Sequence, residues 1–216
     1  MTDLTLVIGN KNYSSWSFRP WLFLRMNHIP FTEVRIPLYL AESKANILRY
    51  SPSGKVPFLR DGHIAVWDSL AICEYAIERF ALATAWPHDP AARAEARSLV
   101  AEMHSGFGAL RSQLSMNCRR EPRAAAFDTA AAADITRIDA LWTSCRERFA
   151  AQGPGLLAPG RWLMPFTRPW CSVLIATSCL AARQRASTWT RCWRCLPCRN
   201  GSPPPGLKRK CWSSLR

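Results

Sequence analysis

The chain has 216 residues, of which 48% are hydrophobic and 20% charged, so it is long and apolar enough to bury a core. This composition excludes intrinsic disorder and a collagen-like fibre. Taken over the whole chain, the net charge of +14 and the nine cysteines suggest a nucleic-acid-binding or metal-binding protein.

Strand and helix patterns alternate through the first part of the chain. A buried strand is predicted over Leu4–Ile8, and Ser17 is predicted to cap the next helix, with Pro20 in its first turn. The elements predicted after it are a strand over Thr32–Ile36, a short helix over Ala41–Tyr50, a hairpin of Val56–Leu59 and His63–Trp67, and a helix over Ser69–Phe80. The order β-α-β-α-β-β-α is typical of a thioredoxin-like domain.

The pattern changes after a proline-containing linker near residues 86–90. One long helix is predicted over Ala91–Met116, because apolar residues recur at spacings of three and four and no proline interrupts them. A second helix is predicted over Ala124–Ala150; the members of its core side are Ile135, Ile138, Leu141, Trp142 and Phe149. We therefore expect an α/β thioredoxin-like domain over 1–84 and an all-α helical domain over 90–155.

Three motifs connect residues 4–150 with a known family. They are the loop Tyr13-Ser14-Ser15-Trp16-Ser17-Phe18-Arg19, the segment Ser51-Pro52-Ser53-Gly54-Lys55-Val56-Pro57-Phe58-Leu59, and Trp67-Asp68-Ser69-Leu70-Ala71-Ile72. Each motif is weak alone, but all three occur in the family's order and spacing. Together they make the chain similar to the cytosolic glutathione transferases.

Such an enzyme holds the thiol of glutathione as a thiolate near neutral pH, although a free thiol titrates near about 8.5. A hydroxyl that donates a hydrogen bond to the sulfur, next to a helix N-terminus, lowers the thiol pKa. The resemblance implies that Ser14 is the catalytic hydroxyl and that Ser15 and Ser17 bind glutathione beside it. Tyr13 is the second choice, because tyrosine-type members use a phenol. The three serines also fit ordinary turn and cap residues.

The other two motifs would hold the rest of glutathione. Val56 and Pro57 fit the family's cis-proline segment, where the backbone pairs with the cysteinyl part, and Lys55 fits the glycyl carboxylate. Ser69, at a helix N-terminus, fits the γ-glutamyl carboxylate, and Asp68 fits its ammonium group. The structural alternatives are a trans proline that ends an edge strand, a solvated lysine and a plain N-cap at Ser69.

The second substrate's pocket is predicted on the first long helix of the helical domain. The resemblance points to Met103, His104, Phe107, Leu110 and Arg111 as its candidates. Methionine and phenylalanine at these spacings fit a packed core as well as a pocket.

The last part of the chain has a different composition. Residues 1–155 hold 18 Lys and Arg with 15 Asp and Glu, whereas residues 156–216 hold 11 Lys and Arg and no acid. Six of the nine cysteines lie in this basic tail. The spacing of Cys192, Cys195 and Cys198 suggests a metal site, but it lacks the second ligand pair of a zinc ribbon. Basic residues between tryptophans suggest nucleic acid, but they do not share one helical face.

A reading frame shifted by one base explains this tail better. If the last base of each codon joins the first two of the next, Met164-Pro165 must give Ala and Trp170-Cys171 must give Val. The stretch 161–171 can then encode Leu-Ala-Asp-Ala-Phe-Tyr-Ala-Pro-Val-Val, which resembles a core helix of the family's second domain. Resequencing the gene around codons 150–160 tests this hypothesis, and an unbroken frame would overturn it.

The sequence thus predicts a serine-type glutathione S-transferase that activates glutathione for attack on a small electrophile. We expect a homodimer in the cytoplasm, with glutathione as cosubstrate and no cofactor, metal, nucleic acid or membrane partner. The N-terminus lacks a secretory pattern, and no apolar run reaches the roughly 18 residues that span a bilayer. Cys73, Cys118 and Cys145 are expected to be reduced and mostly packed.

Three alternatives remain. The loop Ser14-Ser15-Trp16-Ser17 resembles the Ser-Ser-Cys-Ser loop of the zeta-type maleylacetoacetate isomerases, with Trp16 in place of the cysteine. The chain also fits a glutathione-binding or interaction module without turnover. A third possibility is a basic nucleic-acid-binding protein whose tail is genuine.

Overall fold

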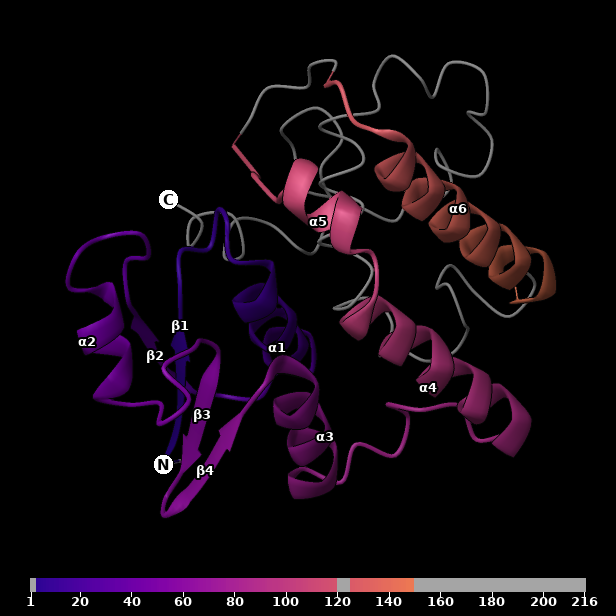
Figure 1. Cartoon of the computed structure of the whole chain (residues 1–216). Coiled ribbons are helices and arrows are strands. Elements are labelled where there is room, and N and C mark those ends of the chain that lie inside the picture. The colour runs from indigo at the N-terminus through magenta and orange to yellow at the C-terminus, as the bar shows by residue number, and fades with distance from the viewer. Residues whose placement is uncertain (1–2, 120–124, 150–216) are drawn as a thin grey trace. The chain divides into compact units, whose positions relative to one another are not determined.

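A computed structural model describes residues 3–119 and 125–149, and the chain divides between Trp86 and Pro87 into two compact units (Figure 1). The basic tail, 156–216, and its reading-frame hypothesis lie outside the described residues. The first unit contains β1 (Leu4–Ile8), α1 (Ser15–Met26), β2 (Thr32–Arg35), α2 (Ser43–Leu48), β3 (Phe58–Asp61), β4 (Ile64–Trp67) and α3 (Ser69–Arg79). Its element order is the predicted one, and the fold is thioredoxin-like.

The four strands form one mixed sheet in the order β2-β1-β3-β4. β1 runs parallel to β2 and antiparallel to β3, and β3 and β4 form the predicted hairpin. Val7 lies opposite Phe58, which in turn lies opposite Trp67. This rung, Val7–Phe58–Trp67, places the end of β1, the start of β3 and the end of β4 at the same edge of the sheet.

Both faces of the sheet are covered. Val7 and Phe58 pack with Ile36 and with Ile47 of α2 on one face. Their neighbours along the strands, such as the fully buried Leu6, point to the other face, because side chains alternate along a strand. α1 and α3 cover that second face, and Figure 1 shows them together on the side of the sheet away from α2.

Asp61, at the end of β3, joins the hairpin to α3. Its Oδ2 accepts a 2.8 Å hydrogen bond from the Tyr75 hydroxyl and a 2.9 Å bond from Arg79 Nε. The Tyr75 bond, with the Arg79 charge, lowers the pKa of the Asp61 carboxyl below its ordinary value. The folded chain therefore holds the Asp61 proton less tightly than the unfolded chain does.

This difference predicts a pH-dependent contribution to stability. Because the folded pKa is lowered, the contribution is present above the ordinary carboxyl pKa and is lost as pH falls through the folded value. We expect Asp61→Asn to lower the free energy of unfolding by about 1 kcal/mol at pH 7, and the difference to shrink below about pH 4. Urea unfolding of the unmodified chain and of Asp61→Asn, at pH 7 and below about pH 4, measures this difference in the free energy of unfolding. A gap between the two proteins that widens in acid would contradict the assignment.

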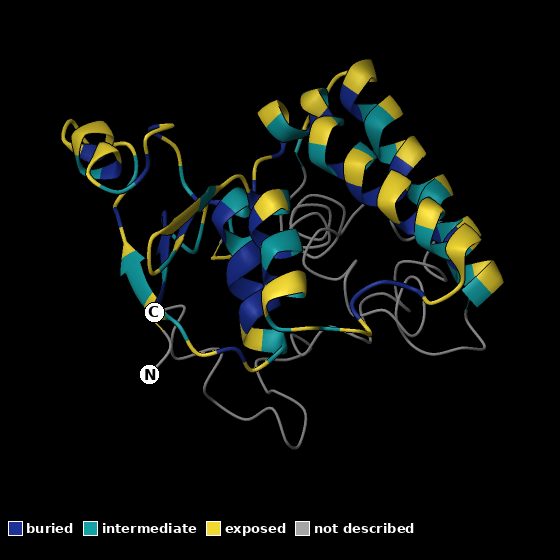
Figure 2. Cartoon of the chain, turned by 90° about the horizontal axis from the view of Figure 1, so that it is seen from below, coloured by how far each residue is buried: buried dark blue, intermediate teal, exposed yellow. Residues whose placement is uncertain are grey.

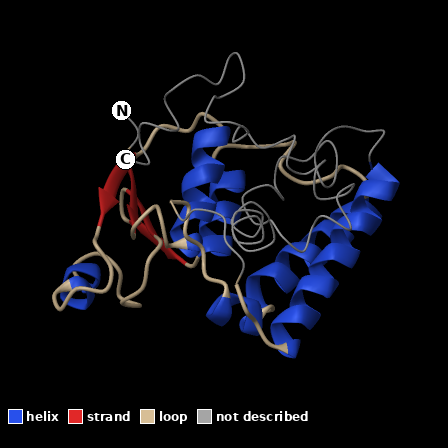
Figure 3. Ribbon diagram, turned by 90° about the horizontal axis from the view of Figure 1, so that it is seen from above, coloured by secondary structure: helices blue, strands red, loops and turns tan. Residues whose placement is uncertain are grey.

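The described part of the second unit contains only helices, as Figure 3 shows: α4 (Pro90–Ser105), α5 (Gly108–Gln113) and α6 (Thr129–Phe149). The prediction of one helix over 91–116 was wrong, because the chain breaks at Gly106 and at Phe107, which has a left-handed φ of 61°. The second predicted helix begins at Thr129, five residues later than expected.

The helices of this unit are joined by packing and by ion pairs. Buried and exposed bands alternate along α6 (Figure 2), and Ile138 and Trp142 of its predicted core side are buried. The other predicted members, Ile135, Leu141 and Phe149, are half-buried. Arg137 of α6 binds the carboxylate of Glu102 on α4 through two bonds of 2.7 and 2.9 Å.

Candidate active site

Ser14 is the N-cap of α1. Its Oγ accepts the Ser17 N–H at 3.4 Å, and its hydroxyl donates a 2.9 Å hydrogen bond to Ser17 Oγ. The prediction of Ser17 as the cap was wrong, because Ser14 satisfies the free Ser17 N–H and so starts the helix earlier. Pro20 consequently lies inside α1 and not in its first turn. As the N-cap, Ser14 has its hydroxyl at the positive end of the α1 helix dipole.

The other residues of the Ser14 loop have different surroundings. Ser17 is buried, and its Oγ accepts the Gly9 N–H at 3.0 Å as well as the Ser14 hydroxyl. These contacts tie the end of β1 to α1. Ser15 is half-buried at the first position of the helix, whereas the Tyr13 side chain is 47% exposed. The structure thus gives Ser14 the helix-terminal hydroxyl position that the resemblance implied.

The second motif lies at the start of β3. The Val56–Pro57 peptide bond is cis, so the trans alternative was wrong. Val56 is half-buried, and among the described residues neither its N–H nor its C=O has a backbone hydrogen-bond partner. Lys55 is exposed, and its N–H donates to Ser53 Oγ at 3.3 Å. The backbone of Val56 is therefore available to a ligand strand.

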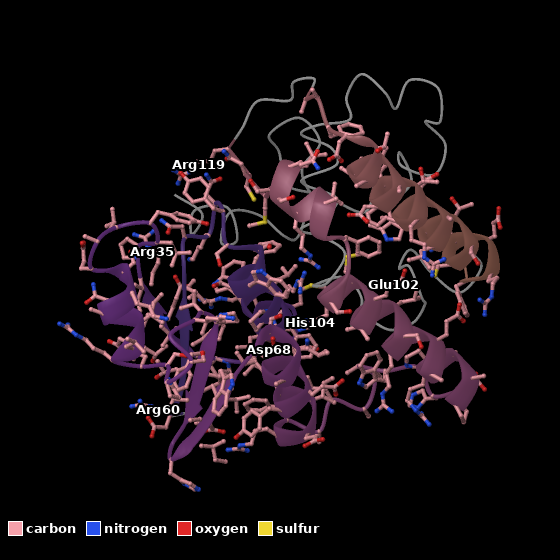
Figure 4. All side chains as sticks on the ribbon, in the orientation of Figure 1. Arg35, Arg60, Asp68, Glu102, His104 and Arg119 are labelled. Carbon is pink, nitrogen blue, oxygen red and sulfur yellow. The ribbon has the colours of Figure 1, made fainter. Side chains whose placement is uncertain are left out.

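The third motif lies at the N-terminus of α3, where Figure 4 labels Asp68. Asp68, with a φ of 77°, caps the helix through Oδ1, which accepts the N–H groups of Leu70 at 2.8 Å and Ala71 at 3.4 Å. The plain N-cap interpretation of Ser69 was wrong, because Asp68 occupies that role. Ser69 is 1% exposed, and its Oγ has no hydrogen-bond partner among the described residues.

The rung Val7–Phe58–Trp67 brings the three motifs to one edge of the sheet. Ser14 follows β1, Pro57 precedes β3, and Ser69 follows β4. Because β3 runs antiparallel to the other two strands, the start of β3 meets the ends of β1 and β4. The Ser14 hydroxyl, the Val56 backbone and the Ser69 hydroxyl thus share one edge. Within residues 3–119 and 125–149, the Val56 backbone has no backbone partner and the Ser69 hydroxyl has no hydrogen-bond partner.

The residues predicted for the second substrate lie in the second unit. Met103 and Leu110 are buried, Phe107 has the left-handed conformation, and His104 is half-buried. Arg111 is occupied by the end of α4: its Nε donates to Gly106 O at 2.8 Å, and its Nη2 donates to the carbonyls of Met103 and His104. Burial lowers the pKa of Arg111 to about 10. The pocket role of these residues stays a prediction.

The described cysteines and acids show no metal centre. Cys73 and Cys145 are buried free thiols, and burial raises the pKa of both, that of Cys145 to about 11. Cys118 is exposed. Within residues 3–119 and 125–149, no three His, Cys, Asp or Glu side chains are grouped to hold a metal ion. Among the helices in those ranges, none combines the length and the apolar character that crossing a bilayer requires.

Sequence reasoning missed a polar network around the Ser14 loop. Glu33 on β2 contacts both Lys11, in the loop after β1, and Trp21 of α1. The alternation of side chains along β2 puts Glu33 on the face of the sheet opposite Val34, but nothing in the sequence pairs it with Lys11. The pairing depends on the parallel register of β1 and β2, in which Leu6 lies opposite Glu33.

Comparison with known proteins gives matches to the first unit and to the whole fold. Residues 13–79 match the family model of the glutathione S-transferase N-terminal domain. A probable maleylacetoacetate isomerase from Caenorhabditis elegans is 33% identical over 95 residues, which are 44% of each chain. A dichloromethane dehalogenase from Methylophilus leisingeri is 36% identical over 66 residues, 30% of this chain and 25% of that one. The chain thus matches less than half the length of these relatives.

Solved structures extend the likeness of the fold beyond the first unit. Poplar glutathione transferase F1 has a TM-score of 0.68 and 18% identity, with 100% of this chain and 97% of that chain covered. A glutathione transferase homologue from Burkholderia, with bound glutathione, has a TM-score of 0.61 and 18% identity, with 88% and 91% covered. Residues 13–79 thus match the N-terminal domain of the glutathione S-transferase family, and the fold of the chain is similar to that of solved glutathione transferases.

Proposed function

We propose that this protein binds glutathione at the shared edge of the sheet and uses the Ser14 hydroxyl to hold its thiol as a thiolate, which attacks a small electrophile. The observation that carries the proposal is the convergence of Ser14, the cis Val56–Pro57 segment and Ser69 through the rung Val7–Phe58–Trp67. We further propose that the protein acts as a homodimer. Its proposed location is the cytoplasm.

The chemistry follows from the single proton of the Ser14 hydroxyl. In the structure this proton is directed to Ser17 Oγ. When glutathione binds, the hydroxyl turns so that it donates to the sulfur, while Ser17 Oγ keeps the Gly9 N–H. The helix N-terminus adds a favourable field for the anion. The thiol proton leaves to solvent, and the sulfur electron pair forms the new bond to the electrophilic carbon. The bond from this carbon to its leaving group breaks, and the leaving group, chloride in a chloronitrobenzene, departs with that electron pair.

The remaining groups of the edge fit the rest of the tripeptide. The backbone N–H and C=O of Val56 pair with the cysteinyl part, as a short added strand does. Ser69 Oγ and the N-terminus of α3 receive the γ-glutamyl carboxylate, and Asp68 balances its ammonium group. Lys55, exposed beside the cis peptide bond, contacts the glycyl carboxylate.

The buried hydroxyl of Ser69 gives a sharp prediction. A buried hydroxyl without a partner opposes folding, so Ser69→Ala leaves the stability of the free chain unchanged or slightly higher. The same change removes a ligand for the carboxylate, and we expect the Kd for glutathione to rise about tenfold. Calorimetric titration and urea unfolding measure the two effects. Ser98→Ala, an exposed serine on α4, is the control that leaves the Kd unchanged.

The function itself is tested with the unmodified chain. We expect retention on immobilised glutathione, elution by free glutathione, and conjugation of glutathione to a chloronitrobenzene acceptor. Retention without conjugation of any electrophile would favour a glutathione-binding module without turnover. Failure to bind glutathione at all would overturn the proposal.

An isomerase is the second candidate, favoured by the 33% identity to a probable maleylacetoacetate isomerase. The loop resemblance supports it, although Trp16 replaces the cysteine of that branch and its ring packs 4.2 Å from the Arg19 guanidinium carbon. An isomerase returns glutathione unchanged, whereas a transferase consumes it. Measuring free thiol during turnover of maleylacetoacetate therefore separates the two reactions.

A further inference from the structure

A three-residue network lies behind the Ser14 loop. Glu33 Oε1 lies 2.8 Å from Lys11 Nζ, and Glu33 Oε2 accepts a 2.8 Å hydrogen bond from Trp21 Nε1. The Lys11 ammonium also lies 5.1 Å from the centroid of the Trp21 ring. Each member thus contacts the other two, and the three come from the loop after β1, from α1 and from β2.

The network is well shielded from water. The side chains of Lys11 and Glu33 are only 12% and 22% exposed, and Trp21 is buried. An ion pair at this depth is screened less than one on the surface. Both oxygens of the carboxylate are used, so Glu33 fixes the direction of Lys11 and of Trp21 at the same time.

Lys11 is connected to Ser14 through the backbone of the loop. The Ser14 N–H donates to Asn10 O at 2.9 Å, which closes a turn that contains Lys11. On the other side of this turn, Asn10 Oδ1 accepts the Leu38 N–H at 2.7 Å. The loop is therefore held at two places on one side, where Asn10 binds Leu38 and Lys11 binds Glu33. On its other side, Ser14 is bound to Ser17 of α1.

We infer that Glu33 is a positioning residue for the Ser14 hydroxyl. By holding Lys11 against β2 and Trp21 against the same carboxylate, it fixes the loop relative to α1, so that the hydroxyl meets the sulfur at hydrogen-bond distance. The inference rests on the proposed function of Ser14. A hydrogen bond weakens when its donor moves by much less than the donor–acceptor distance. A loosened loop therefore weakens the bond from Ser14 to the thiolate, while glutathione still binds.

Glu33→Gln tests this role in the full chain. Glutamine keeps the size of the side chain and can accept the Trp21 bond, but it lacks the charge that holds Lys11. We expect the bound thiol to ionise at a pH higher by about half a unit to one unit, as seen in the ultraviolet absorbance of the thiolate. We expect kcat/KM at neutral pH to fall about three- to tenfold, with the Kd for glutathione changed less than twofold.

Two further variants make the result specific. Lys11→Met breaks the same ion pair from the loop side without changing the sheet, so we expect the same rise in the pKa of the bound thiol. Adding Glu33→Gln to Lys11→Met should lower kcat/KM no further. Glu78→Gln, at an exposed position of α3, removes one carboxylate of the same unit and leaves the titration unchanged. A fall in kcat/KM shared by Glu78→Gln would point to net charge and overturn the positioning role.

The outcomes separate this inference from the function on which it rests. If Ser14→Ala raises the thiol pKa but Glu33→Gln and Lys11→Met titrate like the unmodified chain, the network does not position the hydroxyl and the inference is wrong. If Ser14→Ala itself leaves the titration unchanged, the proposed function fails first, and the inference fails with it.

Discussion

Ser14→Ala lowers kcat/KM for conjugation by about 10²- to 10³-fold, the loss expected when one preorganised donor to a developing or bound anion is removed. The pKa of the bound thiol moves back toward about 8.5, so activity recovers in part as the pH is raised. A titration of the bound thiol by its ultraviolet absorbance, together with the pH profile of kcat/KM, measures both effects.

Controls separate the hydroxyl from the cap, because Ser14 also starts α1. Glycine is tolerated at an N-cap but has no hydroxyl, so Ser14→Gly keeps the stability of the helix and loses the activity. Threonine retains the hydroxyl, so Ser14→Thr keeps much of the activity. Tyr13→Phe tests the exposed phenol, the second choice for the catalytic group. A larger loss from Tyr13→Phe than from Ser14→Ala would make this a tyrosine-type protein.

Arg111→Ala destabilises the end of α4 by about 2–3 kcal/mol, the second large effect that we expect. The guanidinium donates hydrogen bonds to the carbonyl oxygens of Met103, His104 and Gly106. Because α4 ends there, no following helical turn supplies N–H donors to these oxygens. The lowered pKa shows that burying the charge opposes folding. This opposition is present at neutral pH and fades as the pH rises through about 10. Arg111→Ala therefore removes the unfavourable burial of the charge, but it leaves the three carbonyl oxygens without the hydrogen bonds that Arg111 donates.

Native-state hydrogen exchange locates this effect. The amides in the last turn of α4 should exchange about 10²-fold faster in Arg111→Ala, whereas those of β1 should not change. Arg111→Lys should give only partial protection, because one ammonium cannot reproduce the planar fork of the guanidinium. Arg137→Ala, which breaks an exposed ion pair of the same unit, is the comparison that should have a smaller effect. Uniform loss of protection in both units would contradict a local capping role.

Sequence reasoning succeeded where the signal is local. The order of the elements in the first unit and the start of α3 follow from local patterns, and the cis Val56–Pro57 bond agrees with the short motif that carries the family resemblance. It failed where two local signals compete. Both Ser14 and Ser17 fit an N-cap, and the choice depends on the Gly9 N–H, which binds Ser17 Oγ and draws that side chain toward β1.

The break between α4 and α5 was missed for a related reason. The apolar spacing runs through Gly106 and Phe107 without interruption, and only the two glycines on either side of Phe107 mark the change. A Cβ at Gly106 would lie 2.7 Å from the Glu102 carbonyl oxygen, which explains why glycine ends α4. The Glu33 network is a case without any local signal, because its partners are 12 and 22 positions away in the sequence.

The groups that the rung Val7–Phe58–Trp67 brings together also occupy one part of the sequence, and this determines what an error in the reading frame would change. Every group that we assign to glutathione lies between Ser14 and Ser69, upstream of the compositional change in the chain. A frame error near codon 150 would therefore leave these residues unchanged, together with the pocket candidates from Met103 to Arg111, and would alter only the sequence that follows them. We therefore expect glutathione binding to be the property that such an error affects least, because Ser14, Val56 and Ser69 all precede it in the sequence.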